Sequence, residues 1–307
     1  MSTTYDLARR AFSLREIVRP MQTAWPITSN FTGIQQEPYG VFWMPSDCPA
    51  AEFVEFFDSV VQPDTFLLIR DRNCSTIGYI SLFDDLLEVN LNDLSDTKLQ
   101  CIFDKANVIS HEAVLSAEMN LFDAALASID TIEGFGRFRL VKSGNDIVGW
   151  VSWEDFECLQ FKTCLFSLLL EYEYLLLRLL LQEPEKAISV LSVDEKDGIR
   201  KRIIQIRQKG RPRGTSKREV KEREISFHDM LNWSDFGTKK EMVKRLRLQV
   251  ILDQLKMESF EEFEDLSGKA VQYRNWCAHT GTEERGIDTS LEAVCQFIDS
   301  LEKSISS

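Results

Sequence analysis

Two stretches in the first half of the chain repeat one pattern, and this repeat limits the possible folds more than any other feature. Residues 65–87 read as an apolar strand, a polar turn, a second strand and a helix start, and residues 136–156 follow the same order. Aligned on Gly78 and Gly149, the copies lie 71 residues apart (149 − 78). A helix-like segment precedes each copy, at residues 49–61 and 117–129. The pattern predicts a duplicated α/β unit.

Near residue 159 the pattern changes to one that is almost entirely helical. Residues 159–181 are apolar on nearly every side, which is typical of a helix buried on several faces in a bundle or a dimer. Glu171, Glu173 and Arg178 within this stretch argue against a membrane span. Further helices are expected at about residues 239–257, 260–279 and 290–305.

We therefore predict an α+β protein of more than one domain. The first domain is expected over residues 1–158, with its repeats at about 10–90 and 100–158. The second is expected to be an all-α helical bundle over residues 159–307. With 307 residues, of which 44% are apolar, the chain is long enough to build two hydrophobic cores.

The net charge of −13 is unevenly distributed. Residues 1–160 hold 11 basic and 24 acidic residues, so residues 161–307 hold 25 of each (36 − 11 and 49 − 24). A surface that binds a polyanion is therefore expected in the second half. Seven cysteines without a C-x-x-C pair and a start without a signal-peptide pattern indicate a reduced, cytoplasmic protein. Three histidines exclude a histidine-rich metal centre unless a partner chain completes it, and no metal site is expected.

Each repeat ends in a glycine followed by a serine and then an aspartate. The residues of interest are Ser81 and Asp84 in the first copy and Ser152 and Asp155 in the second. At a strand-to-helix junction, such a hydroxyl can bind a phosphate beside free backbone N–H groups, and the carboxylate can bind a ribose diol. Ser-x-x-Asp is also the spacing of a capping box, which stabilises a helix start without a ligand. Both interpretations stay open.

Because both ends lie inside two copies of one α/β unit, residues 10–158 resemble a CBS-domain pair. Members of that family commonly bind AMP, ATP, S-adenosylmethionine or cyclic dinucleotides between their two halves. The resemblance implies a regulatory adenosine-type nucleotide, held by Ser81 and Asp84 in one half and by Ser152 and Asp155 in the other. The acidity of this half favours a singly phosphorylated or zwitterionic ligand. Residues 34–43 depart from the family pattern and are expected to be additional sequence.

The segment 260–281 contains the strongest candidate for a catalytic site. Five apolar residues at helical spacing predict the core-facing side of an amphipathic helix: Phe263, Leu266, Ala270, Tyr273 and Cys277. At about 100° per residue, Arg274, Asn275 and His279 fit one broad surface near the end of that helix.

These three residue types suit cleavage of RNA by its own 2′-hydroxyl, without a metal. An imidazole with an ordinary pKa of about 6.5 exchanges protons at neutral pH. A guanidinium stabilises the extra charge of a pentavalent phosphorane, and an amide can orient the phosphate or the imidazole. Alternatively, Arg274 and Asn275 fix the helix end or a dimer contact, and His279 interacts with the helix dipole.

The apolar first helix, the charged middle and this Arg-Asn-Trp-Cys-Ala-His helix end together resemble a HEPN domain over roughly residues 160–307. In that family, an arginine and a histidine with four to six residues between them mark metal-independent endoribonucleases, whose cleft usually forms between two copies. The resemblance implies catalytic roles for Arg274, Asn275 and His279, with Glu171 or Glu173 orienting the arginine. Many relatives bind RNA or dimerise without demonstrated chemistry.

The stretch 200–223 is strongly basic, with 11 basic residues against two acidic ones. Its glycines and proline predict a flexible basic insertion over about residues 200–224. The candidate RNA contacts are Arg200, Lys201, Arg202, Lys209, Arg211 and Arg213. The short Lys209–Gly214 cluster is similar to a minor-groove hook, but it has no second copy, so DNA is less expected than RNA. A solvated linker is the alternative.

The sequence thus favours a nucleotide-regulated endoribonuclease that acts as a homodimer and requires no cofactor for catalysis. A prokaryotic defence or toxin role would suit this architecture by analogy. The main alternative is a non-catalytic RNA- or protein-binding dimer with a CBS scaffold or sensor. A DNA-binding regulator is a third.

Overall fold

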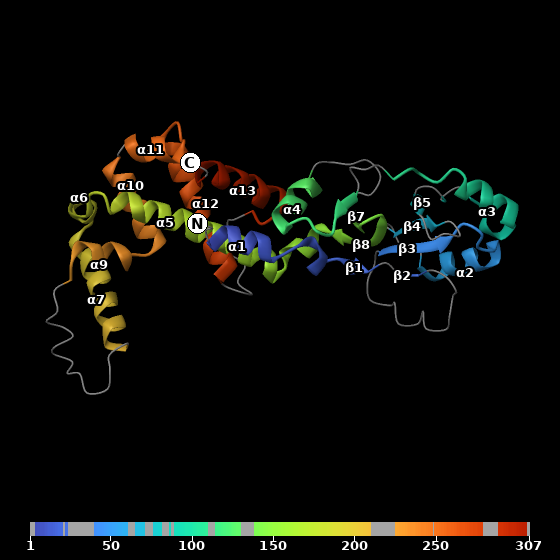
Figure 1. Ribbon diagram of the computed structural model, residues 1–307, viewed down its shortest axis with the longest axis horizontal. Helices are drawn as coiled ribbons and strands as arrows, with labels where there is room; N and C mark the ends of the chain where they lie inside the picture. The colour runs from blue at the N-terminus through green and yellow to red at the C-terminus, as the bar shows by residue number, and fades with distance from the viewer. Residues whose placement is uncertain are drawn as a thin grey trace. The chain divides into compact units, whose positions relative to one another are not determined.

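The computed structural model describes residues 4–20, 22–23, 40–60, 65–70, 76–81, 86, 89–109, 114–129, 138–209, 225–247, 249–278 and 288–305. The chain forms two compact units (Figure 1). The α/β unit comprises residues 10–161, and the helical unit comprises residues 1–9 together with residues 162–307.

Each repeat of the α/β unit folds as a strand, a helix and a β-hairpin. The first contains β3 (Gly40–Pro45), α2 (Ala50–Val60), β4 (Thr65–Arg70) and β5 (Thr76–Ser81). The second contains β6 (Val114–Ser116), α4 (Leu121–Ile129), β7 (Phe138–Ser143) and β8 (Asp146–Ser152). In both, the first strand pairs parallel to the second and the hairpin is antiparallel, with a bulge at the same position. The predicted duplication is confirmed.

The two repeats exchange short segments. The strand β1 (Arg19–Pro20) pairs with β8 of the second repeat, whereas β2 (Gln22–Thr23) pairs with β3 of the first. In the other direction, Asn107 exchanges backbone hydrogen bonds of 2.8 and 3.0 Å with Tyr79 on β5. Arg19 faces Trp150 on β8, the position that corresponds to Tyr79. The second strand of each hairpin, β5 or β8, therefore pairs on its outer side with a short segment of the other repeat.

Gly78 and Gly149 each lie where the backbone of the exchanged segment passes close to the hairpin. A Cβ atom on Gly78 would lie 2.9 Å from the Cβ atom of Ala106 and from the carbonyl oxygen of Asn107. A Cβ atom on Gly149 would overlap the carbonyl oxygen of Arg19. The glycines are thus explained by close approach of two backbones, independently of any ligand.

The core of the first repeat lies between β3, β4, α2 and α3 (Asp96–Phe103). Phe53 on α2 and Phe103 on α3 pack edge to face, with ring centroids 5.9 Å apart. A second cluster joins the two hairpins through Leu68, Tyr79, Leu140 and Trp150. The expectation that residues 34–43 are additional sequence was wrong for residues 40–43. They begin β3, which buries Phe42 and Met44 in the core.

The described residues of the helical unit form helices and their connections. The helices are α1 (Thr4–Ala11), α5 (Leu159–Leu180), α6 (Pro184–Ser189), α7 (Val193–Lys209), α9 (Phe227–Asn232), α10 (Phe236–Leu246), α11 (Gln249–Leu255), α12 (Phe260–Ala278) and α13 (Leu291–Ile305). Within the described residues, none of them is long and apolar enough to cross a membrane.

The observed division differs from the predicted one at both ends of the first domain. Residues 1–9 group with the helical unit because Tyr5 and Arg9 both contact Glu302 on α13, the latter in an ion pair of 3.1 Å. Phe161 stays with the α/β unit because its ring packs edge to face on Phe122, 5.2 Å away.

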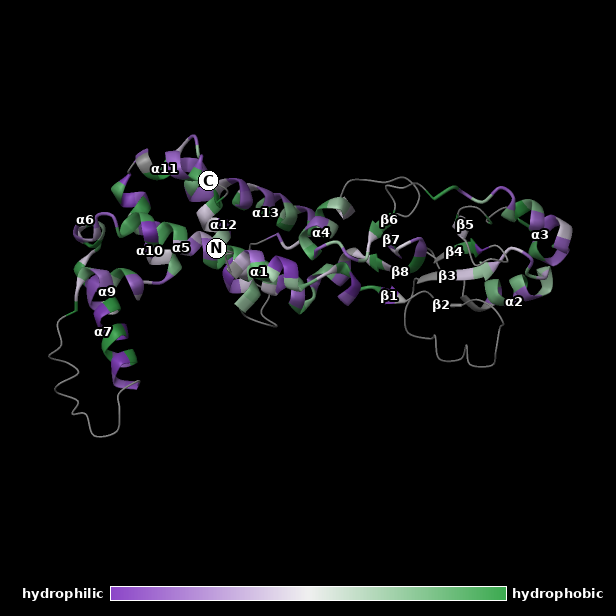
Figure 2. Cartoon of the chain, in the orientation of Figure 1, coloured by the Kyte–Doolittle hydropathy of each residue, from purple (hydrophilic) through white to green (hydrophobic). Residues whose placement is uncertain are grey.

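Two predictions about the helices were wrong. Residues 200–209 belong to α7 rather than to a flexible insertion, because Ile199 and Ile203 lie one turn apart and are both buried. Hydrophobic and hydrophilic residues accordingly alternate along α7 (Figure 2). The helix expected over residues 239–257 is two helices, α10 and α11, because Arg247 adopts a left-handed conformation (φ 45°) and ends α10.

Candidate functional site

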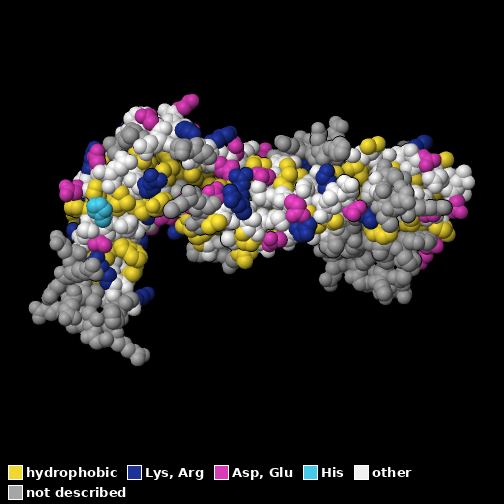
Figure 3. Space-filling model, viewed as in Figure 1, with side chains coloured by type: hydrophobic (Ala, Val, Ile, Leu, Met, Phe, Trp, Pro, Cys, Tyr) yellow, Lys and Arg dark blue, Asp and Glu magenta, His cyan; other side chains and the backbone are white. Residues whose placement is uncertain are grey.

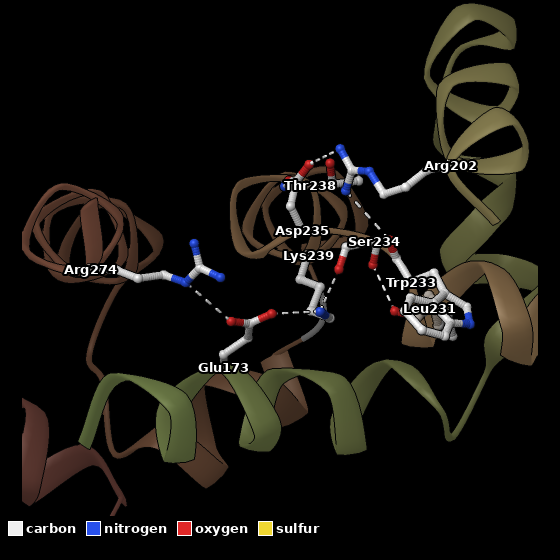
Figure 4. Close-up of polar contacts among 9 residues, drawn as sticks. All are labelled: Glu173, Arg202, Leu231, Trp233, Ser234, Asp235, Thr238, Lys239 and Arg274. Carbon is white, nitrogen blue, oxygen red and sulfur yellow. Dashed lines mark hydrogen bonds and ion pairs between the residues drawn. The ribbon is translucent and has the colours of Figure 1, made fainter. Parts of the chain in front are cut away.

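Arg274 lies near the end of α12, where it faces Glu173 on α5 (Figure 4). Its Nε atom is 3.5 Å from Oε2 of Glu173. This nitrogen is buried and, within the described residues, makes an ion pair but no hydrogen bond. The carboxylate of Glu173 thus contacts the guanidinium at Nε rather than at a terminal nitrogen (Figure 4). The structure thus brings Arg274 together with one of the two glutamates that the sequence analysis proposed for it.

The second oxygen of Glu173 binds a lysine that the sequence analysis missed. Oε1 of Glu173 accepts a hydrogen bond of 2.7 Å from Nζ of Lys239 on α10. The same ammonium donates to the backbone carbonyl of Ser234 at 2.6 Å. The side chain of Lys239 is only 4% exposed, against 16% for Glu173 and 33% for Arg274. Lys239 lies in a run of charged residues, so the sequence carries no signal that it is buried.

The stripe predicted on α12 is buried at Phe263, Leu266, Ala270 and Tyr273, which confirms the predicted orientation of the helix. The fifth residue, Cys277, is partly buried, and burial raises the pKa of its thiol to about 12, so the thiol is neutral at physiological pH. Asn275 is half-buried, and His279 lies outside the described residues.

A cavity of about 660 Å³ lies between α12 and α13. Tyr273 lines it, but Arg274 is not among its described lining residues. This cavity is therefore not the cleft that the sequence analysis expected around Arg274.

Two of the predicted RNA contacts form ion pairs with acidic neighbours. Arg200 pairs with Asp197 at 3.2 Å, and Arg202 pairs with Asp235 at 3.1 Å. Lys201 and Lys209 are exposed on α7, whereas Arg211 and Arg213 lie outside the described residues. Basic and acidic side chains are interspersed on the face shown in Figure 3. The basic character of α7 is thus partly neutralised within the protein.

In the second repeat, the serine and the aspartate of the strand end contact each other. Oδ2 of Asp155 accepts hydrogen bonds from the backbone N–H (2.7 Å) and the hydroxyl (3.0 Å) of Ser152. Oδ1 accepts a bond of 2.7 Å from Nε of Arg19, whose guanidinium lies 5.0 Å from the centre of the Trp150 ring. The capping interpretation therefore describes the observed state of this copy, with Arg19 as an added partner.

In the first repeat only the serine can be placed. Ser81 ends β5 and is 7% exposed, whereas Asp84 lies outside the described residues. Within the described residues, no three His, Cys, Asp or Glu side chains gather as they would around a metal ion.

No family model and no curated protein matches this chain. Among solved structures, the chain is similar to the cystathionine β-synthase pair domain of a proposed Mg²⁺ transporter from Shewanella oneidensis MR-1. The sequences are 17% identical, the alignment covers 38% of this chain and 61% of that one, and the TM-score is 0.26. It is also similar to CBSX2 in complex with AMP, at 16% identity over 47% of this chain and 92% of that one, with a TM-score of 0.28. Neither TM-score establishes a shared fold.

Proposed function

We propose that this protein is a metal-independent endoribonuclease whose activity an adenosine-type nucleotide regulates. The helical unit would cleave RNA with Arg274, Asn275 and His279, and the α/β unit would act as a CBS-like sensor. One observation carries the proposal: the contact between Glu173 and Arg274 is made at Nε, 3.5 Å from the carboxylate, rather than at a terminal nitrogen of the guanidinium.

A guanidinium oriented in this way suits a phosphate. Two parallel N–H donors match two phosphate oxygens, and an arginine stays charged at all physiological pH values. The partial burial of Arg274 strengthens its interaction with a phosphorane, because water screens that interaction less than at an open surface. An arginine whose Nε is already paired also loses less conformational entropy on binding.

The proposed reaction needs no external nucleophile. The 2′-hydroxyl of the RNA loses its proton to an imidazole and attacks the adjoining phosphorus, while the 5′-oxygen leaves with a proton from a second group. The products are a 2′,3′-cyclic phosphate and a 5′-hydroxyl. If two copies of His279 meet across a dimer, one can accept the first proton and the other can donate the second.

The surface of α5 beside Glu173 supports a cleft completed by a second copy. Tyr174 is 57% exposed and Leu170 is 38% exposed, although both are large and apolar. They lie next to Glu173 and one turn before it on the same helix. Exposed apolar side chains that border a candidate site are typical of an interaction surface.

The internal geometry of the α/β unit supports the sensor. The two hairpins face each other as near copies, with the strand-end serines at equivalent positions opposite Phe66 and Phe138. In the second copy, Arg19 adds a cation beside the carboxylate of Asp155. A cation at this position would attract a nucleotide phosphate and offset the acidity of this half of the chain.

We expect purified protein to cleave single-stranded RNA in EDTA and to leave a 2′,3′-cyclic phosphate. Arg274→Ala and His279→Ala should each lower kcat/KM by about 10³-fold, because each removes a group that stabilises the transition state. Gel analysis of 5′-labelled RNA measures the rate, and mass spectrometry identifies the ends. Lys269→Ala, which removes an exposed cation from the same helix, should cut at the normal rate.

Equal cleavage by Arg274→Ala and the unchanged protein would overturn this assignment. Salt-dependent RNA binding without cleavage, with any nucleotide present, would instead identify a non-catalytic RNA-binding dimer.

For the sensor, calorimetry should detect binding of at least one ligand among AMP, ATP, S-adenosylmethionine and cyclic dinucleotides. Asp155→Asn should weaken that binding about 10- to 100-fold, the usual effect of losing a hydrogen bond to a charged group. Asp146→Asn, at an exposed position in the same hairpin, should bind normally. Unchanged affinity of Asp155→Asn would remove Asp155 from the site.

A further inference from the structure

We propose that Lys239 is a positioning residue for Arg274 and acts on it through Glu173. Its ammonium holds Oε1 of Glu173, so that Oε2 faces Nε of Arg274. The consequence for cleavage rests on the function proposed above. The positioning itself does not, and it can be measured separately.

The burial of Lys239 is the first argument. A buried ammonium is costly unless its protons are hydrogen-bonded. Lys239 meets this condition with two acceptors, the carboxylate of Glu173 and the carbonyl of Ser234, at 2.7 and 2.6 Å. An ion pair this deeply buried adds little stability over apolar side chains of the same volume, so its effect lies mainly in fixing geometry.

The second argument is that the two oxygens of the Glu173 carboxylate contact two different cations. Lys239 makes the short hydrogen bond to Glu173, whereas Nε of Arg274 stands 3.5 Å away without one. Lys239 therefore determines where the carboxylate lies, and Arg274 adapts to it. The 3.5 Å contact is longer than a hydrogen bond, and catalytic hydrogen bonds often shorten when substrate binds.

The residues around Lys239 are linked by further polar contacts (Figure 4). Asp235 caps α10 by accepting a hydrogen bond of 2.8 Å from the backbone N–H of Thr238. Arg202 on α7 binds the same carboxylate, and the hydroxyl of Ser234 donates to the carbonyl of Leu231 at 2.7 Å. These contacts hold the turn that presents the Ser234 carbonyl and the Lys239 side chain to Glu173.

The positioning can be tested by NMR on the full chain labelled with ¹⁵N-arginine. The Nε–H signal of Arg274, assigned by its absence in Arg274→Lys, should be protected from exchange because Nε is buried beside a carboxylate. Lys239→Met should shift this signal and increase its exchange rate about 10-fold or more. The control is Lys240→Met, which removes a neighbouring charge from the same helix and should leave the signal in place.

Kinetics then test the link to cleavage. Lys239→Met should lower kcat by about 10²-fold, the order expected when a catalytic group is misplaced by about 1 Å, with little change in KM. In an Arg274→Ala background the same substitution should have no further effect, because the residue it positions is gone. Thermal unfolding confirms that Lys239→Met is folded under the assay conditions.

The two proposals fail in different ways. An unchanged Arg274 signal in Lys239→Met overturns the positioning role, whether or not the protein cuts RNA. A shifted signal in a protein whose Arg274→Ala variant cuts normally keeps the positioning role and refutes the ribonuclease. Additive losses in the double variant would show that Lys239 acts independently of Arg274, which also overturns the inference.

Discussion

Gly149→Ala should destabilise the α/β unit by about 3 kcal/mol, at the upper end of the usual cost of overpacking. The added methyl group would overlap the carbonyl oxygen of Arg19. That carbonyl belongs to β1, which β8 holds in register, so it cannot rotate away as a flexible side chain could. The pairing of β1 with β8 must therefore open, and Arg19 must leave Asp155.

Urea unfolding measures this change, and hydrogen exchange of peptides from β8 locates it in the α/β unit. Gly78→Ala should have a smaller effect, because its closest contacts are 2.9 Å and one of them is the Cβ atom of Ala106. Gly198→Ala is the matched control. Nothing lies within 4 Å of its added methyl group, and it should stabilise α7 by about 0.8 kcal/mol. A Gly149→Ala protein as stable as the unchanged one would refute the close approach of β1.

Glu173→Leu should destabilise the helical unit by about 3–5 kcal/mol, the usual cost of breaking a buried ion pair by removing one partner. The substitution leaves the ammonium of Lys239, only 4% exposed, with the Ser234 carbonyl as its remaining acceptor. It also removes the carboxylate from Nε of Arg274, a nitrogen that is buried as well.

The double variant Glu173→Leu, Lys239→Met provides the decisive comparison. It replaces the charged pair with apolar side chains of similar size, so most of the lost stability should return. Chemical unfolding of the single and double variants gives both values. If the double variant is no more stable than Glu173→Leu alone, the cost lies elsewhere than in the unpaired ammonium.

Local patterns along the chain were sufficient to predict the duplicated unit and the orientation of α12. A strand, a turn and a strand at matched spacing predict a hairpin, because side-chain alternation and turn residues act over a few positions. The buried stripe from Phe263 to Tyr273 likewise follows from helical periodicity. Periodicity was insufficient at residues 200–209, where a high content of basic residues obscured the buried pair Ile199 and Ile203.

Some residues of the candidate sites could likewise be predicted from local spacing, and others could not. Arg274 and Asn275 are neighbours on one helix, so their placement can be predicted from the sequence, whereas His279 lies outside the described residues. Lys239 could not be found, since its burial depends on α5 and α10 packing together around Glu173. The pairing of Asp155 with Arg19 could not be predicted either. Arg19 lies 136 residues earlier in the chain, and it contacts Asp155 because β1 pairs with β8.

The sequence by itself determined the repeat, the change to a helical second half and the presence of an arginine on a helix surface, because each depends on near neighbours in the chain. Only the tertiary structure decided why Gly78 and Gly149 are needed, which glutamate pairs with Arg274, and which groups hydrogen-bond to the carboxylate of Asp155. Those answers depend on contacts between segments far apart in sequence, and such contacts are selected by shape and burial rather than by local spacing.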